Sequence, residues 1–317
     1  MSDVLTLHGL GCSVEVRCSG DAAAPLLEAL RAAWSRCLVA DGRVEPRAAN
    51  PVEARLDDEG DLAHRLMATT QTVTRALIAA QAGHLLMVHA GAVGHPLTGV
   101  SLVYVAPGGT GKTTLSRRLG QSYGYLTDET VGMDADGRIL PYPKPLSVRR
   151  QEQPGVKDEL SPDALGLLAA PPAPVASRVV LLARDPAATA ADVEEVPFMD
   201  AVFALTEQSS SLAALPRPLH RMADFIDAAG PVLRLRYAEA ADLDGTLTAV
   251  LAQGKAPRLS AVAVAIYDLT EHEIEVESLA EALESQVGAP ADRSTLEATE
   301  AAVAMMVRHG ILTRSSR

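Results

Sequence analysis

The stretch Val103-Tyr-Val-Ala-Pro-Gly-Gly-Thr-Gly-Lys-Thr-Thr-Leu115 decides the fold class of this 317-residue chain. Before its glycines, residues 101–105 are a serine followed by four apolar residues and predict a buried strand. Residues 106–113 follow the relaxed Walker A pattern, which ends in Gly-Lys-Thr. Leu115 and Leu119 then continue in helical spacing. Strand, loop and helix in this order predict an α/β protein with a nucleotide-binding P-loop.

Each residue type in this loop suits the binding of phosphate. The glycines allow backbone angles that turn N–H groups inward, at the positive end of the following helix. Lys112 adds a positive charge and is expected to face solvent, and the Thr113 hydroxyl is placed to ligate magnesium. The expected nucleotide contacts are Pro107, Gly108, Gly109, Thr110, Gly111, Lys112, Thr113 and Thr114. A glycine-rich turn that contains Gly-Lys-Thr by chance is the alternative, and the flanking patterns argue against it.

Two neighbouring segments carry polar side chains in apolar surroundings. Residues 85–93 predict a strand with His89 in its middle, where a histidine is more often a core residue than a catalytic one. Residues 125–131 predict another strand, with Asp128 and Glu129 at its centre. Because side chains alternate along a strand, both acids can serve one site only if the strand ends there.

The order of these segments resembles a known family. The His-x-Gly strand, the Walker A loop, the Asp-Glu strand and the segment Pro141-Tyr-Pro-Lys-Pro-Leu-Ser-Val-Arg149 resemble the HPr kinase/phosphorylase family and its HPr-kinase-related members. That family shares a P-loop fold with phosphoenolpyruvate carboxykinase. The resemblance covers about residues 84–240 and implies a kinase that uses ATP and Mg²⁺.

The resemblance also implies a role for each polar residue of these segments. His89 would lie beside the transferring phosphate, and Asp128 would act as the base toward the acceptor hydroxyl. Glu129 would hold the metal together with Thr113. Phosphoryl transfer depends on positioning, magnesium and charge neutralisation, all of which this set could supply. A carboxylate beside the acceptor oxygen can take its proton.

The chain departs from true HPr kinases in two places. Glu129 stands where the family usually has Asp, and the Glu-containing Arg-Gly-Leu-Gly stretch after the acid strand is absent. Instead, alternating prolines predict a stiff, extended loop with Lys144 and Arg149 as its charged ends. This loop is either a solvated surface segment or a contact for phosphate or acceptor. It resembles related kinases found beside biosynthetic gene clusters, which argues against HPr as the acceptor.

The chain is expected to form three parts. Residues 1–82 predict a small N-terminal α+β cap, with a strand-like segment at 5–17 and helices near 24–36 and 61–82. Residues 83–253 predict the P-loop, HPr-kinase-like core. Its expected further elements are helices at 156–170, 201–214 and 219–229, and strands at 178–183 and 231–237.

The last part, residues 258–317, is expected to be a small, mostly helical domain behind a linker at 253–257. The expected helices are 261–269, 277–287 and 295–309. Its ending resembles winged-helix and PqqD-like domains, and the latter are peptide-binding modules. Because it lacks a basic recognition helix, a peptide-binding or packing role is favoured over DNA binding.

Composition limits the partners and the compartment. The net charge of −12 argues against nucleic acid as a partner, because a basic stripe is needed to displace counterions. We expect no membrane span and no export signal, and therefore a cytoplasmic protein. Cys12, Cys18 and Cys37 lack metal-ligand spacing and are expected to be reduced thiols.

Two classes of function stay open at this point. The favoured class is a Mg²⁺- and ATP-dependent phosphotransferase that acts on an alcohol: Ser or Thr of a peptide or carrier protein, or a small metabolite in a biosynthetic pathway. The alternative is a non-catalytic ATP-binding adaptor that presents a nucleotide-dependent conformation to a partner. His89 and Asp128 favour the kinase, because an adaptor has no use for a base beside an acceptor. A homo-oligomer is compatible with either class.

Overall fold

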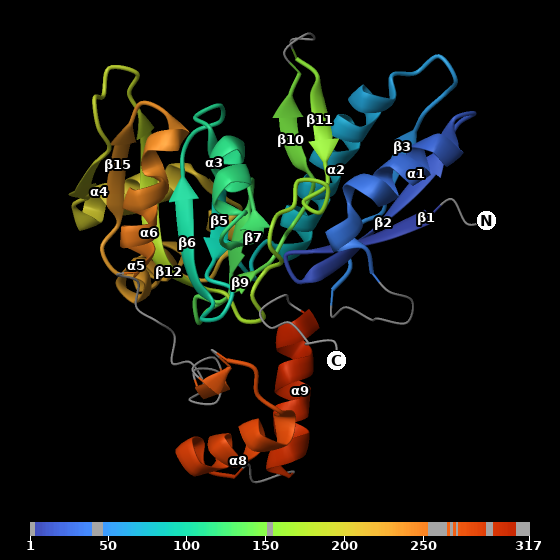
Figure 1. Ribbon diagram of the computed structural model, residues 1–317. Coiled ribbons are helices and arrows are strands. Elements are labelled where there is room, and N and C mark those ends of the chain that lie inside the picture. Colours follow the sequence, from blue (N-terminus) through green and yellow to red (C-terminus); the bar gives the residue numbers. More distant parts are fainter. Residues whose placement is uncertain are drawn as a thin grey trace.

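The computed structural model shows a mixed α/β protein with several sheets and some parallel strands, which confirms the expected α/β class. It describes residues 4–39, 47–150, 155–252, 265–266, 269–270, 272–289 and 294–308. A central sheet with its helices lies beside the N-terminal strands and helices, and the last helices lie below both (Figure 1). None of the helices in these ranges is long and apolar enough to cross a lipid bilayer.

The central sheet has six strands in the order β13-β15-β12-β6-β5-β7. Their bounds are β5 Ala90–Gly94, β6 Val100–Val105, β7 Gly124–Thr127, β12 Val175–Arg184, β13 Asp192–Glu195 and β15 Leu233–Tyr237. β6, β12 and β15 run parallel, whereas β5 and β13 are antiparallel to their neighbours. Every residue of β6 is buried, as in a strand that is covered on both faces. The expected strands at 101–105, 178–183 and 231–237 are confirmed.

Helices cover both faces of the central sheet. Their bounds are α3 Lys112–Leu119, α4 Phe198–Glu207, α5 Pro218–Ala229 and α6 Asp244–Ala252. Along β6, Leu102 and Tyr104 pack with α3 and α6, whereas Val103 and Val105 pack with α4 and α5. This alternation sends successive side chains into two cores. The loop of residues 106–111, here called the glycine loop, connects the end of β6 to the start of α3.

A second, four-stranded sheet lies against the first, in the order β14-β4-β8-β9. Its bounds are β4 Leu86–Val88, β8 Val131–Met133, β9 Ile139–Leu140 and β14 Ser209–Ser210. β4 pairs with β8 in this sheet, and β5 pairs with β7 in the central one. The chain thus passes between the sheets twice at the same place, once at His89 and once at residues 128–130.

This crossing corrects two expectations. The expected single strands at 85–93 and 125–131 are each broken into two strands. Each half pairs in a different sheet, so the backbone must bend between them. β7 ends at Thr127, which meets the condition that both acids need in order to serve one site.

The N-terminal part is a three-stranded sheet with helices packed against it. Its strands are β1 Val4–Gly9, β2 Cys12–Ser19 and β3 Val52–Arg55, and its helices are α1 Ala23–Ala33, η1 Ser35–Cys37 and α2 Leu62–Gln81. The expected segment 5–17 is therefore a hairpin, and the helices near 24–36 and 61–82 are confirmed. Asp61 caps α2 by accepting hydrogen bonds from the Ala63 and His64 N–H groups. The core of this part also contains Met87 and Tyr142, so it is packed firmly against the central part.

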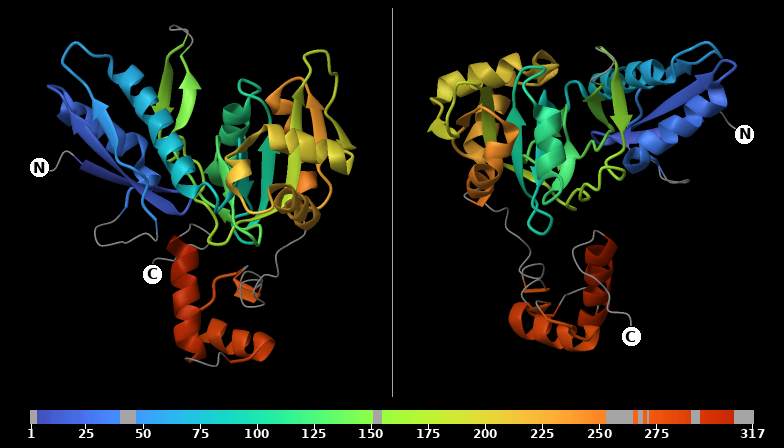
Figure 2. Two further views of the ribbon diagram at one scale, coloured as in Figure 1. Left: turned by 180° about the vertical axis from the view of Figure 1, so that it is seen from behind. Right: turned by 45° about the horizontal axis from the view of Figure 1, so that its top comes forward.

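A two-stranded hairpin, β10 (Leu146–Arg149) with β11 (Lys157–Leu160), projects between these two parts (Figures 1 and 2). The expected helix at 156–170 is therefore wrong. Residues 157–160 find a ladder partner in β10, and the chain then turns. Pro162 and the left-handed φ of Gly166, 65°, both oppose a continuing helix.

The remaining expectations concern the last third of the chain. The expected helix at 201–214 is shorter, because α4 ends at Glu207 and is followed by the short strand β14 and the single turn η2 (Leu212–Ala214). The helix at 219–229 is confirmed as α5. α8 (Val276–Val287) and α9 (Thr295–Arg308) confirm two C-terminal helices, whereas the linker at 253–257 and most of 261–269 lie outside the described residues.

Candidate functional site

The glycine loop has the backbone geometry of an anion cradle. Gly109 and Gly111 have φ of 85° and 106°, a region that suits glycine. α3 begins directly at Lys112 without a side-chain cap, so the positive end of the helix faces the loop. From β15, the Tyr237 hydroxyl donates to the Thr110 carbonyl oxygen at 3.0 Å and holds the loop against the sheet.

Lys112 is buried, contrary to the expectation that it faces solvent. Its ammonium donates to the carbonyl oxygens of Ala106 at 2.5 Å and Pro107 at 3.2 Å, inside its own loop. Burial lowers the pKa of Lys112 to about 8, against the attraction of Asp128 and Glu129. The Lys112 ammonium, which a bound phosphate would need, therefore lies beneath the loop and is hydrogen-bonded to two of its carbonyl oxygens.

The first turn of α3 meets the acid that follows β7. The Thr113 hydroxyl donates to Asp128 Oδ2 at 2.8 Å. The Tyr125 hydroxyl donates to Asp128 Oδ1 at 3.1 Å, and burial keeps the pKa of this phenol well above its ordinary value. Asp128 is itself almost fully buried, so these contacts replace the water that a carboxylate would otherwise bind.

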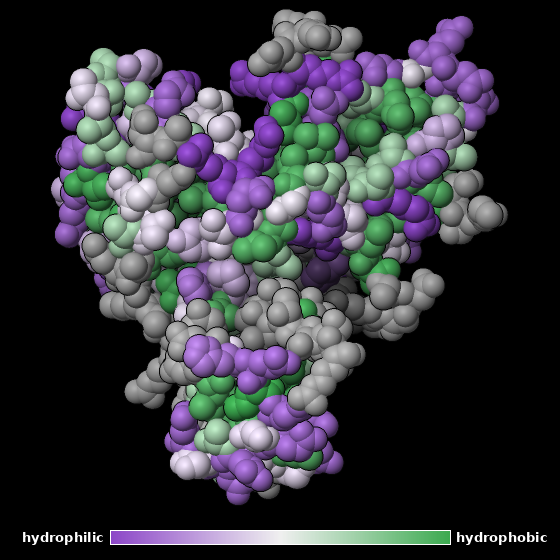
Figure 3. Space-filling view, in the orientation of Figure 1, coloured by the Kyte–Doolittle hydropathy of each residue, from purple (hydrophilic) through white to green (hydrophobic). Residues whose placement is uncertain are grey.

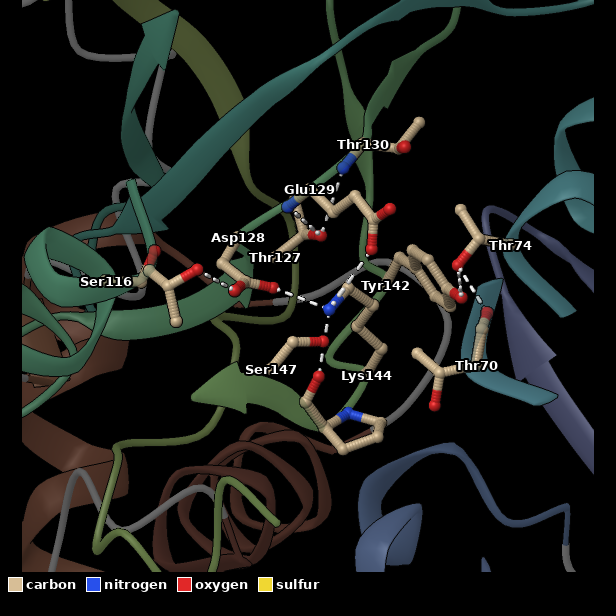
Figure 4. Close-up of polar contacts among 12 residues, drawn as sticks. Thr70, Thr74, Ser116, Thr127, Asp128, Glu129, Thr130, Tyr142, Lys144 and Ser147 are labelled. Atoms are coloured by element: carbon tan, nitrogen blue, oxygen red, sulfur yellow. Dashed lines mark hydrogen bonds and ion pairs between the residues drawn. The ribbon is translucent and has the colours of Figure 1, made fainter. Parts of the chain in front are cut away.

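Lys144 lies between the two acids (Figure 4). Its ammonium is 2.9 Å from Asp128 Oδ1 and 3.2 Å from Glu129 Oε2, and it also donates to the Pro145 carbonyl oxygen at 2.9 Å. The side chain is only 1% exposed, so a solvated surface loop is the wrong description of this residue. Burial alone would lower the pKa of Lys144, but the acids around it raise that pKa above its ordinary value.

Glu129 and His89 are the more open members of the group. The Glu129 side chain is 32% exposed, whereas that of Asp128 is 2% exposed. His89 sits in the bend between β4 and β5, where its backbone N–H donates to the Gln208 carbonyl oxygen at 2.7 Å. Burial, and then the charge of Lys112, lower the pKa of His89, so its imidazole is neutral at neutral pH.

These residues line one cleft of about 580 Å³. Figure 3 shows a hollow with hydrophilic walls between the part that carries α3 and the part that carries the hairpin. The expected site residues in its lining are Gly108, Gly109, Gly111, Lys112, Thr113, Thr114, His89, Asp128, Glu129, Lys144 and Arg149. Pro107 and Thr110 do not line it; instead, the Thr110 hydroxyl donates to the Pro107 carbonyl oxygen at 2.9 Å within the loop.

Sequence reasoning missed several residues of this cleft. They are Thr70, Gln71, Arg117, Ser147, Val148, Lys157 and Arg184. The alternation of Ser147 with Arg149 was a usable signal, because residues two apart on a strand share a face. Lys157 could not be found, since its segment was assigned to a helix.

The donor set fits magnesium better than a metal held by protein alone. Among the described residues, no group of three or more His, Cys, Asp and Glu side chains converges on one point. Thr113 and Asp128 offer oxygen ligands side by side, and magnesium is commonly held by one or two protein oxygens together with phosphate oxygens. The three cysteines are buried and form no disulfide.

The comparisons with known proteins add no assignment. The chain matches no protein-family model, and a search of the curated proteins finds no relative. Function must therefore be inferred from the cleft itself and from the motifs that line it.

Proposed function

We propose that this chain is a Mg²⁺- and ATP-dependent phosphotransferase that moves the γ-phosphate of ATP to an alcohol. The observation that carries the proposal is the 2.8 Å hydrogen bond between Thr113 and Asp128, which joins the first turn of α3, directly after the glycine loop, to the acid after β7. A glycine-rich turn without function has no reason to bring a hydroxyl to a buried carboxylate. This pairing of a hydroxyl from the start of α3 with a strand-end acid is what a magnesium-phosphate site requires.

The nucleotide phosphates would lie on the glycine loop, at the N-terminus of α3. Lys112 would then exchange the carbonyl oxygens of Ala106 and Pro107 for phosphate oxygens. Thr113 and Asp128 would hold magnesium, which supplies charge neutralisation when bound. His89 precedes Ala90, which pairs with Val105 at the end of β6, and would offer a neutral hydrogen-bond donor beside the loop.

The contacts favour a division of roles between the acids that differs from the one the family resemblance implies. Asp128 is buried and bonded to Thr113, which suits the metal side. Both acids line the cleft, and Glu129 is the more open of the two, which suits the base. In the reaction, the acceptor oxygen bonds to the γ-phosphorus while the bond from that phosphorus to its bridging oxygen breaks. ADP leaves with that electron pair, and Glu129 takes the acceptor proton.

We also propose an HPr-kinase-like core at residues 83–253. Support comes from the order of the motifs and from the parallel strands β6, β12 and β15 beside antiparallel β5. The C-terminal helices suit the proposed PqqD-like or winged-helix-like domain at 258–317, which would receive a peptide acceptor or a partner.

A non-catalytic ATP-binding adaptor is the second candidate, and one observation favours it. Both carboxylate oxygens of Asp128 already accept hydrogen bonds, and Lys144 is also paired with Glu129. A site with its acids neutralised in this way could hold ATP without activating a hydroxyl.

Mass spectrometry separates the two candidates. The protein is incubated with Mg²⁺-ATP and with Ser/Thr peptides, carrier proteins or small alcohols, and the acceptors are weighed for an added phosphoryl group. Glu129→Gln is the matched control, since it keeps the shape of the side chain and removes the base. A wild-type protein that modifies no acceptor, yet binds a partner only with ATP, would establish the adaptor instead.

A further inference from the structure

Two positive charges face each other across the β10–β11 hairpin. Arg149 and Lys157 are directly opposite residues of this antiparallel pair. Like charges in such positions destabilise a strand pair. Among the residues that the structure describes, neither side chain has an ion pair or hydrogen bond.

Two other arginines beside paired strands do have an acidic partner. The next arginine along, Arg150, is bonded to Asp158 at 2.6 Å and 2.8 Å. In the central sheet, Arg234 of β15 pairs with Glu194 of β13 at 2.7 Å. With 40 acidic against 28 basic residues, counterions are abundant in this protein. An uncompensated pair of cations in such a chain indicates a place for an anion from outside.

The pair faces the cleft. Ser147 and Arg149 share one face of β10, opposite Glu159 and Lys157, and Ser147 donates to Glu159 Oε1 at 2.8 Å. Arg149 and Lys157 both line the cleft that holds the glycine loop and the acids. A methyl carbon added to Gly109 would lie 3.6 Å from Arg149 Nη2, so the guanidinium reaches over the loop.

We propose that Arg149 and Lys157 form an anion subsite for the acceptor, so that the acceptor is an alcohol that also carries a carboxylate or phosphate group. This inference rests on the proposed kinase function. The glycine loop, Lys112 and magnesium would serve the phosphates of ATP. An anionic acceptor would be repelled by the γ-phosphate and the two acids, and the hairpin cations offset that repulsion. Arg149 offers a planar fork and Lys157 a point charge, both suited to such a group.

The test uses the full chain and inorganic phosphate as the probe. The glycine loop is first filled with Mg²⁺ and a non-hydrolysable ATP analogue, and phosphate is then titrated by calorimetry or ³¹P NMR. Phosphate should bind the filled protein, and Arg149→Met or Lys157→Met should weaken that binding by about tenfold or more. Arg150→Met is the matched control, since it removes the same charge from the same hairpin at a residue paired with Asp158.

Each outcome decides the matter. Phosphate that binds only when the analogue is absent would assign the hairpin cations to the nucleotide and overturn the proposal. An equal loss of phosphate binding in Arg150→Met would show that the hairpin attracts phosphate only through its general positive charge, and would overturn the proposed subsite. If Lys157→Met weakens binding of the ATP analogue as much as it weakens binding of phosphate, the subsite again belongs to ATP. If the analogue fails to bind at all while phosphate still binds at the hairpin, the kinase proposal falls and the anion subsite stands.

Discussion

The Lys144 ammonium lies 2.9 Å from Asp128 Oδ1, and the same ammonium is 3.2 Å from Glu129 Oε2. One buried lysine is thus shared by the two acids that follow β7 (Figure 4). Two carboxylates this close would repel each other in a site from which water is excluded. The Lys144 ammonium offsets that repulsion. It occupies the position between the two carboxylates where a divalent cation could otherwise bind.

Replacing Lys144 should therefore change both stability and metal binding. Lys144→Met leaves a buried carboxylate without its cation, which should cost about 3 to 5 kcal/mol in the free energy of unfolding. The freed acids should also bind Mn²⁺ more tightly in the absence of nucleotide. Urea denaturation measures the first effect, and Mn²⁺ titration followed by electron paramagnetic resonance measures the second.

Lys157→Met is the control for this prediction, because it removes a lysine from the same cleft without touching the acids. It should leave nucleotide-free Mn²⁺ binding unchanged. Tight Mn²⁺ binding by the wild type without nucleotide would contradict the idea that Lys144 holds the place of a cation.

Lys112→Ala tests the nucleotide site. Loss of one charge-assisted contact should weaken ATP binding by about 2 to 5 kcal/mol, as measured by calorimetry. The fold should persist, because β6 and α3 keep their own hydrogen bonds on either side of the loop. Only the buried Ala106 carbonyl oxygen loses its donor, since exposed Pro107 can bind water instead. Arg150→Ala serves as the control for charge loss alone. Unchanged ATP affinity in Lys112→Ala would overturn the assignment of the glycine loop.

Asp128→Asn and Glu129→Gln test the division of roles between the acids. If Glu129 is the base, Glu129→Gln should keep ATP binding and slow transfer by about 10²- to 10⁴-fold. Asp128→Asn should instead raise the magnesium concentration needed for binding, because Asp128 is bonded to Thr113. The family resemblance implies the reverse pattern, so the two kinetic profiles identify which acid accepts the proton.

Much of the site could be predicted because its signals are local. The glycine loop, β6 and α3 follow from a contiguous pattern, and each element forms where the residues indicate. The contact between Asp128 and Thr113 could have been predicted, since both residues belong to motifs that the sequence displays.

The rest depends on pairing that no local pattern encodes. Residues 85–93 look like one strand, but β4 and β5 separate because their partners lie in different sheets. Lys144 sits among prolines that indicate an exposed loop, yet the acids of a distant segment hold it inside. The helix expected at 156–170 failed for the same reason, because only β10 makes residues 157–160 a strand.

Glu159 should make stability depend on pH. Burial raises the pKa of its carboxyl to about 7, although Lys144 and the hydrogen bond from Ser147 favour the ionised form. The unfolded chain loses this proton near the ordinary value of 4.5, so the folded state holds more protons between these values. Stability should therefore fall as pH rises from about 4.5 to about 7. Glu159→Gln should flatten that fall in urea denaturation series, and an equal slope in both proteins would contradict it.

The C-terminal helices should be dispensable for ATP binding. Their apolar cluster is built from Ile266, Leu279, Leu283 and Val303, with Leu97 from the β5–β6 connection packed against it. α8 and α9 lie at the end of the molecule opposite the β10–β11 hairpin (Figure 2), and none of their described side chains lines the cleft. A chain that ends at Gln253 should bind Mg²⁺-ATP with an affinity within about twofold of that of the full chain. This change is well below the loss of affinity expected from removing one phosphate contact. It should also lose selection among peptide acceptors. Calorimetry measures the ATP affinity, and the acceptor assay measures the selection among peptides. If the shortened chain is insoluble or cannot bind ATP, residues 258–317 belong to the core, and their cluster supports the site through Leu97.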